Sequence, residues 1–302
     1  MANITAAQVK ELREITGAGM MDCKKALTAT DGDMDKAVDF LREKGLAGAQ
    51  KKAGRIAAEG IVDTKLSDDA KRGVVVEVNA ETDFVAKNEK FRSYVADVTA
   101  QALVTPAADI DAFLAEKLSS MISIIGENMH IRRFTVLNEE NGFVQSYIHA
   151  GGKIGVILVV ETDVVNDEIK DMAKNVCMQI AALKPTYTSD AEISADFIEK
   201  EKEILKAQIM NDPKESSKPE KVINGMIEGR IKKELKDICL MDQVYVKAED
   251  GKQSVKAYVD SVAKANNAKI TVKTFVRFET GEGLEKKNED FAEEVAKQMA
   301  GK

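Results

Sequence analysis

A repeated segment constrains the fold of this chain more than any other feature. Residues 73–79 read GVVVEVN, a run rich in β-branched residues, and an ETD triplet follows at 81–83. Residues 155–161 read GVILVVE and end in a second ETD triplet, 80 residues after the first. Such runs favour buried strands, because branched side chains pack well on a pleated surface. The chain is therefore predicted to contain two copies of one sheet-forming unit.

Each copy continues with a helical pattern and is preceded by a partner strand. Apolar residues recur at i, i+3, i+4 and i+7 after both triplets, which is the period of a helix that covers a sheet. Partner strands are expected at 61–66 and 143–149, and a helical stretch at 109–127 leads to a further strand at 130–137. The helical apolar positions are Phe91, Tyr94, Val95, Val98 and Ala102 in the first copy and Ile169, Met172, Ala173, Val176 and Ile180 in the second. The predicted fold class is α+β, with two related hairpin-plus-helix subdomains.

The first 45 residues predict three short helices. Thr5 begins the first helix with a capping box, the second helix covers 22–27, and Asp33 caps the third. Gly45 is expected to lie just beyond the end of the third helix. The small and basic residues at 46–60 then predict a linker, either a solvated helix or a tether.

Residues 187–239 predict an antiparallel coiled-coil hairpin that stands away from the body. Two highly charged helices carry narrow apolar stripes, and Pro213 and Pro219 interrupt them. The stripes are Phe197, Ile198, Ile204, Leu205 and Ile209 on the first helix and Val222, Met226, Ile227, Ile231 and Leu235 on the second. The tail predicts a strand at 243–247, a helix at 253–265, a strand at 269–279 and a last helix at 287–299.

These patterns predict six parts along the chain. They are a three-helix domain at 1–45, a linker at 46–60, a first core subdomain at 61–140, a second core subdomain at 141–186 and 240–280, the hairpin at 187–239 and a C-terminal module at 281–302.

Composition argues against several function classes. With 44 basic and 51 acidic residues the net charge is −7, whereas a nucleic-acid surface needs clustered cations. Three cysteines without CxxC spacing and only two histidines predict no metal site and no disulfide framework, and no cofactor is expected. No apolar run is long enough to span a bilayer and the N-terminus lacks a secretory pattern, so a cytoplasmic protein is expected. We expect the chain to work by contact with a partner and not as an enzyme.

Five collinear segments together resemble the bacterial elongation factor Ts family, the nucleotide-exchange factors of elongation factor Tu. They are ELREITGAGMMDCKKAL at 11–27, TDFVAKN at 82–88, IGENMHIRR at 125–133, SYIHAGGKIGV at 146–156 and FVRFETGEGLEK at 275–286. The resemblance implies that the three-helix domain is UBA-like (ubiquitin-associated-like) and that the hairpin is a coiled coil. It also implies a factor that promotes GDP release from elongation factor Tu so that GTP can bind.

The first implied contact segment is formed by Thr82, Asp83, Phe84 and Val85. Taken alone, this fragment favours a half-buried Phe with a capping Asp. The second copy has Val164 opposite Phe84, so the repeat itself does not require an aromatic residue there. The resemblance implies that the segment enters near the Mg²⁺ and phosphate site of the partner, with Phe84 as a wedge and Asp83 reorganising the polar groups that hold the metal.

Further contacts are implied at Ile125, Gly126 and His149. A glycine permits close backbone approach, although IGEN is also an ordinary helix stop. His149 lies at the end of a predicted strand, where a structurally satisfied histidine is the alternative.

A soft apolar pocket for a partner helix is expected at the N-terminal domain. Val9, Leu12, Met20 and Met21 would line it, since methionine adapts to irregular surfaces, although a Met pair is also common in a core. The resemblance adds an apolar pair from the tail. Here that pair reads Val246-Lys247, so only Val246 is apolar.

The expected partner is elongation factor Tu in its GDP-bound and nucleotide-free forms, with no direct nucleic-acid or membrane partner. The sequence leaves the oligomeric state open, a homodimer or a 2:2 assembly included. Two other functions remain as alternatives. A scaffold or chaperone-like protein would need the hairpin and the helical domain but not Phe84, and an enzyme using paired carboxylates would need a cleft.

Overall fold

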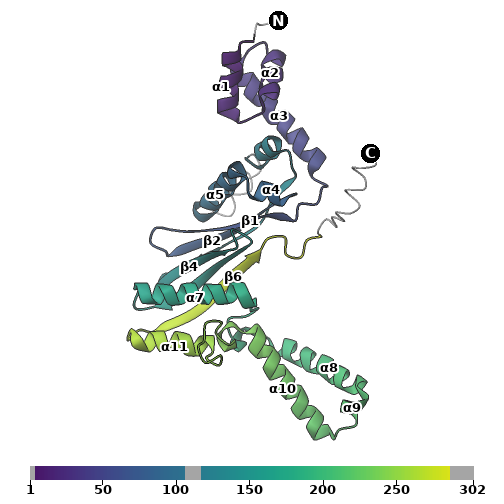
Figure 1. Ribbon diagram of the computed structural model, residues 1–302, viewed down its shortest axis with the longest axis vertical. Helices are drawn as coiled ribbons and strands as arrows, with labels where there is room; N and C mark the ends of the chain where they lie inside the picture. The colour runs from purple at the N-terminus through teal and green to yellow at the C-terminus, as the bar shows by residue number, and fades with distance from the viewer. Residues whose placement is uncertain (1–3, 106–116, 286–302) are drawn as a thin grey trace.

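Two three-stranded antiparallel sheets form the centre of the molecule, of which the computed structural model describes residues 4–105 and 117–285 (Figure 1). The first sheet has the order β1-β2-β3 and the second β4-β5-β6. The strands are β1 (Glu59–Leu66), β2 (Arg72–Ala80), β3 (Met129–Asn138), β4 (Gly142–His149), β5 (Ile154–Thr162) and β6 (Ile270–Glu279). The predicted strands of both copies are therefore confirmed, and the two repeated runs are the central strands, β2 and β5.

The two sheets pack against each other face to face. A buried cluster joins their inner faces, and the outer faces are covered by α5 (Glu89–Val104) and α7 (Asp167–Leu183). The inner cluster comprises Val62, Val75, Val144, Ile157, Val159 and Phe278. Because β2 and β5 have a covered surface on both sides, their apolar residues run continuously and do not alternate with polar ones. The chain belongs to the α+β class, with layers in the order helix, sheet, sheet, helix.

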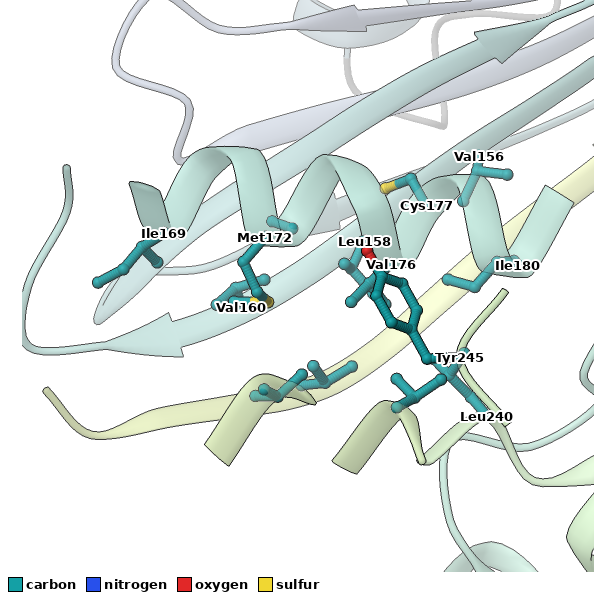
Figure 2. Packing of buried hydrophobic residues seen from close by; sticks show 14 of the residues in the cluster. Val156, Leu158, Val160, Ile169, Met172, Val176, Cys177, Ile180, Leu240 and Tyr245 are labelled. Carbon is teal, nitrogen blue, oxygen red and sulfur yellow. The ribbon is translucent and has the colours of Figure 1, made fainter. Parts of the chain in front are cut away.

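The outer face of the second sheet carries one of the two largest cores (Figure 2). Figure 2 shows Met172 and Val176 of α7 directed toward Leu158 and Val160 of β5. Helix α11 (Val255–Ala265) closes this core from the tail. Asn166 begins α7 by accepting a hydrogen bond from the Ile169 amide, and Asn88 caps α5 in the same way. The predicted helices after both repeats are confirmed.

The repeat extends to an irregularity in the third strand of each sheet. The register of β2 with β3 shifts at Glu77, where Arg132 is an extra residue on β3. The register of β5 with β6 shifts at the corresponding place, where Lys273 is extra on β6. Arg132 pairs with Glu77, and Lys273 pairs with Glu161. Both copies therefore use a bulge to aim a cation at a carboxylate of the central strand or its end.

Three helices precede the sheets: α1 (Ala6–Thr16), α2 (Met20–Ala29) and α3 (Met34–Lys52). Thr5 and Gln8 form the predicted capping box, and the three helices share a small core of their own. The prediction that α3 ends at Gly45 is wrong, because the helix continues through the first half of the predicted linker to Lys52. A side chain at Gly45 would meet the Ser123 hydroxyl at 3.0 Å, so this glycine permits close helix packing instead of ending the helix.

A helical hairpin extends away from the sheets (Figure 1). Helices α8 (Ala195–Asn211) and α10 (Glu220–Ile238) lie side by side, and the short α9 (Pro213–Ser216) forms the tip. Their contact is a buried row of Ile209, Ile223, Ile227 and Ile231. At the tip, Arg230 donates to both carboxylate oxygens of Glu215 at 2.8 Å.

The tail differs from prediction at 243–247. This segment is no strand: a 3₁₀ turn, η2 (Leu240–Asp242), precedes it, and only a single bridge joins Val244 to Ser254. The side chains of Gln179 and Gln243 take up backbone groups here, so no ladder forms. Of the predicted helix at 109–127, residues 117–125 are helical, while 109–116 and the predicted last helix at 287–299 lie outside the described residues.

Candidate functional site

The predicted wedge segment forms a single helical turn, α4 (Asp83–Ala86), between β2 and α5. Thr82, and not Asp83, is its N-cap, and its hydroxyl accepts a hydrogen bond from the Val85 amide. Val85 and Ala86 point into the core under α5, so the turn is anchored. Phe84 points the other way and is 80% exposed. The alternative of a half-buried Phe with a capping Asp is therefore wrong.

The second copy of the repeat treats the same positions differently. Val164, which stands opposite Phe84, packs against the core of the second sheet. Asp163 accepts a hydrogen bond from the Lys269 amide and so serves the fold. In the first copy, Phe84 does not pack into the core and the Asp83 carboxylate bonds to Lys87 of its own turn, so both side chains lie at the surface.

Asp83 lies in a positively charged surrounding. Lys87 donates to its carboxylate at 2.6 Å, and this hydrogen bond, aided by the charges of Lys87 and Lys153, holds the pKa of Asp83 below its usual value. The Lys87 ammonium also lies 5.9 Å from the centre of the Phe84 ring. The carboxylate is thus ionised at neutral pH and only half-covered, so it is available to a partner.

Two glutamates join this segment to the IGEN segment. The Glu127 carboxylate accepts from the Thr82 amide at 3.0 Å and from the Thr82 hydroxyl at 2.7 Å. In return, Glu81 accepts from the Asn128 amide at 2.6 Å and pairs with Arg55 at 3.3 Å. Sequence reasoning missed both glutamates as site residues. Each lies beside a recognised motif, but only the fold brings the motifs together.

Ile125 is the last residue of the helix at 117–125, and Gly126 follows it. Ile125 is partly buried against the core of the first subdomain, whereas Gly126 is exposed. Gly126 has a φ of 88°, which favours glycine, and a side chain there would meet no atom within 4 Å. The glycine thus ends the helix and leaves open space above its backbone.

His149 lies at the exposed end of β4, where its Nδ1 is 2.9 Å from the Tyr147 hydroxyl. The turn that follows approaches the first subdomain closely: Arg92 of α5 donates to the Gly151 carbonyl at 3.2 Å. Gly152 adopts a φ of 104°, and a side chain there would meet Ile61 at 2.3 Å. The turn after His149 is therefore packed beside β1 and α5, at the same end of the sheets as α4.

The expected N-terminal pocket is only partly present. Val9 and Leu12 are buried in the core of the three helices, so they do not line an open pocket. Met20 and Met21 are 60% and 63% exposed and form an apolar surface at the start of α2. These methionines are available to a partner, whereas Val9 and Leu12 are not.

The structure does not bring Val246 to this surface. The Val246 amide donates to Gln179 of α7 at 2.8 Å, and Figure 1 shows α7 on the far side of the sheets from α2. Its side chain is 46% exposed there.

Across 4–105 and 117–285, no group of three or more His, Cys, Asp and Glu side chains is placed to hold a metal ion. None of the helices in these ranges combines the length and apolarity that crossing a bilayer needs. What gathers at one end of the sheets is an exposed Phe, a half-exposed carboxylate, a histidine and an open glycine.

Comparisons with known proteins show which family this chain is similar to. A family model described as "Elongation factor TS" matches residues 81–282. A curated elongation factor Ts from Clostridium perfringens (strain SM101 / Type A) is 52% identical over 309 residues, which covers 99% of this chain and all of that protein. Those from Clostridium botulinum (strain Eklund 17B / Type B) and Clostridium tetani (strain Massachusetts / E88) are each 50% identical, over 98% of this chain and 99% of each relative.

Proposed function

The chain belongs to the elongation factor Ts family, and on this premise we propose that it is a guanine-nucleotide exchange factor for elongation factor Tu. Family membership makes it a translation elongation factor. In the proposed reaction it binds the GDP-bound partner, promotes GDP release and so lets GTP bind. The chain performs no bond chemistry of its own.

The observation that carries the proposal is the exposure of Phe84. Leaving a Phe side chain in water forgoes about 1.5–3 kcal/mol of burial, and the sequence of the second copy shows that the repeat does not need it. Its anchoring through Val85 and Ala86 suits a side chain that must enter a partner in one direction. We assign Phe84 the role of a wedge near the Mg²⁺ and phosphate site of the partner.

The neighbouring residues supply the remaining parts of the site. Asp83, ionised and half-exposed, would compete for the polar groups that hold the metal. Ile125, Gly126 and His149 would contact the partner around it, and the surface of Met20 and Met21 would take a partner helix. Acceleration of GDP release by a thousandfold needs about 4 kcal/mol of differential stabilisation, which exceeds what one Phe supplies, so several contacts are required.

Linkage sets the energetic logic. If the exchange factor weakens nucleotide binding by a given ratio, bound nucleotide weakens binding of the exchange factor by the same ratio. We therefore propose that the nucleotide-free form of elongation factor Tu is the tightly bound partner and that GTP entry releases the factor.

Finer features of the fold also belong to the proposal. The separate core of α1–α3 supports a UBA-like domain, and the narrow isoleucine row between α8 and α10 supports a coiled coil. The proposal includes a cytoplasmic protein with no direct nucleic-acid or membrane partner, acting as a homodimer or in a 2:2 assembly with elongation factor Tu.

The test is release of fluorescently labelled GDP from purified elongation factor Tu, followed by stopped flow. We expect the protein to accelerate release and Phe84→Ala to lower that acceleration about tenfold to a hundredfold, because about 1.5–3 kcal/mol of burial is lost. Val104→Ala is the matched control, since Val104 is 71% exposed on the same subdomain but at the far end of α5.

Two outcomes would contradict the proposal. If the wild-type protein binds the partner without changing GDP release, the scaffold function is favoured. If Phe84→Ala and Val104→Ala behave alike, Phe84 is no wedge. Thermal unfolding should be the same for all three proteins, because exposed side chains contribute little to stability.

A further inference from the structure

We infer that Glu127 is a positioning residue that holds Phe84 in the orientation needed for nucleotide exchange. The inference rests on the proposed function and adds a residue to its site. Among the described residues, no hydrogen bond or ion pair joins Glu127 to Phe84 or Asp83. Its effect on Phe84 therefore passes through Thr82, to which it is bonded twice.

The first step is the grip on Thr82. One carboxylate accepts from both the amide and the hydroxyl of this residue, at 3.0 and 2.7 Å. Hydrogen bonds to an ionised acceptor are roughly twice as strong as those between neutral groups. Two such bonds to one residue determine both its backbone position and its side-chain rotamer.

The second step leads from Thr82 to Phe84. Thr82 has φ −129° and ψ 155°, the extended conformation of an N-cap, and from there its hydroxyl accepts from the Val85 amide. The Thr82 hydroxyl has one hydrogen, which it donates to the Glu127 carboxylate. Its oxygen lone pairs are therefore left to face the Val85 amide. The direction of the α4 turn, and with it the direction of Phe84, therefore depends on the Glu127 carboxylate.

The third step is the reciprocal bond. Glu81 accepts from the Asn128 amide at 2.6 Å, while Glu127 accepts from the Thr82 amide. The dipeptides Glu81-Thr82 and Glu127-Asn128 are therefore joined twice, because the carboxylate of each accepts a hydrogen bond from an amide of the other. The Glu81 side chain is only 9% exposed, which shields this pairing from water.

The consequence is that two contact segments form one rigid unit. Gly126, with open space above it, directly precedes Glu127, and Phe84 follows Thr82 by two residues. Ordering a loop on binding costs free energy, and a surface ordered in advance avoids that cost. Glu127 therefore serves exchange by ordering the surface before the partner arrives.

The first measurement needs no partner. Amide hydrogen exchange of the free protein should show faster exchange of the Thr82 amide in Glu127→Ala, by at least about tenfold, with unchanged protection in the central strand β2. Glu127→Gln keeps one acceptor oxygen and should give an intermediate rate. Unchanged protection at Thr82 would overturn the inference, as would a general loss of protection that includes β2.

The second measurement is a double-mutant cycle in the GDP-release assay at saturating factor. Glu127→Ala should lower the acceleration about tenfold in the wild-type background but less than about twofold in the Phe84→Ala background, because both changes remove the same action. A merely structural residue would lower the rate by the same factor in both backgrounds, and that result would overturn the inference. Glu140→Ala is the matched control, since Glu140 is exposed beyond the far end of β3.

The two measurements separate the inference from the proposed function. If the wild-type protein fails to accelerate GDP release, the proposed function fails, and the role of Glu127 in exchange fails with it. If release is accelerated and depends on Phe84 but not on Glu127, only the positioning role fails.

Discussion

At the scale of single residues, the carboxylate of Glu77 has a structural role that its position in an apolar run conceals. Its side chain has no exposed surface and lies within the central strand β2. It accepts from Arg132 at 3.1 Å, from Arg133 at 2.6 Å and from the Gly281 amide at 2.7 Å. Glu77 therefore ties the segment after β6 to the first sheet.

Replacing Glu77 by Gln should lower the free energy of unfolding by about 3 kcal/mol, at the low end for a broken buried ion pair because both arginines are partly exposed. Urea denaturation at neutral pH measures this. Glu199→Gln is the control, since Glu199 is 69% exposed and forms an i,i+3 pair with Lys202 that should contribute less than about 1 kcal/mol. Equal losses in the two variants would contradict the assigned role.

Glu279 predicts a pH dependence of stability. Hydrogen bonds from Lys184 and Arg277 lower its pKa from 4.5 to about 2. A carboxyl group whose pKa is lower in the folded state stabilises the protein at pH values above its pKa in the unfolded state. This stabilisation is lost as the pH falls through the pKa of the folded state. The side chain is 35% exposed, so solvent screening reduces the contribution to about 1 kcal/mol.

Glu279→Gln should therefore lose about 1 kcal/mol at about pH 7, and the difference from wild type should shrink between about pH 4.5 and pH 2. Urea unfolding of both proteins across this range gives the comparison. A difference that stays constant down to about pH 2 would show that the ion pairs of Glu279 do not stabilise the fold.

At the scale of elements, the helical hairpin is an insertion with its two ends side by side. The amides of Thr186 and Tyr187 both donate to the Ile238 carbonyl, at 2.8 and 3.1 Å, and the Leu240 amide donates to Tyr187 at 2.9 Å. The chain thus leaves and re-enters the second subdomain at one place. The hairpin core of four isoleucines is separate from the core under α7.

Replacing residues 189–237 by a linker of about six Gly and Ser residues should leave both sheets folded, because closing a short loop between neighbouring ends costs little. We expect circular dichroism to lose helical signal while the thermal transition stays cooperative. In the GDP-release assay the excised protein should retain dependence on Phe84, because α4 belongs to the first subdomain whereas the hairpin leaves the second subdomain after α7. Loss of cooperative unfolding would show that the hairpin is part of the body.

At the scale of the whole molecule, local signals were predictable from sequence and long-range pairings were not. The cap residues Thr5, Asp33 and Asn88 and the β-branched runs act within a few residues, so the sequence indicates the elements they begin. The packing of the two sheets is only hinted at, by valines at both odd and even positions of 73–79.

The site shows the same division. The motifs around Phe84 and Gly126 were identifiable from sequence, but the bond between Thr82 and Glu127 joins residues 45 positions apart. Nothing in either motif states that the other is its neighbour. The exposure of Phe84 also depends on which side of α4 the core occupies, and that is settled only by the fold.

The order of strands in the second sheet has a consequence for synthesis of the chain. Strand β5 pairs with β4, which precedes it closely, and with β6, which begins at Ile270 after the whole hairpin. Until β6 has been made, one edge of the strand GVILVVE is unpaired, and such an edge promotes association between chains. A chain ended before residue 270 should therefore aggregate, which light scattering would detect, whereas the first sheet can be completed as soon as β3 has been made.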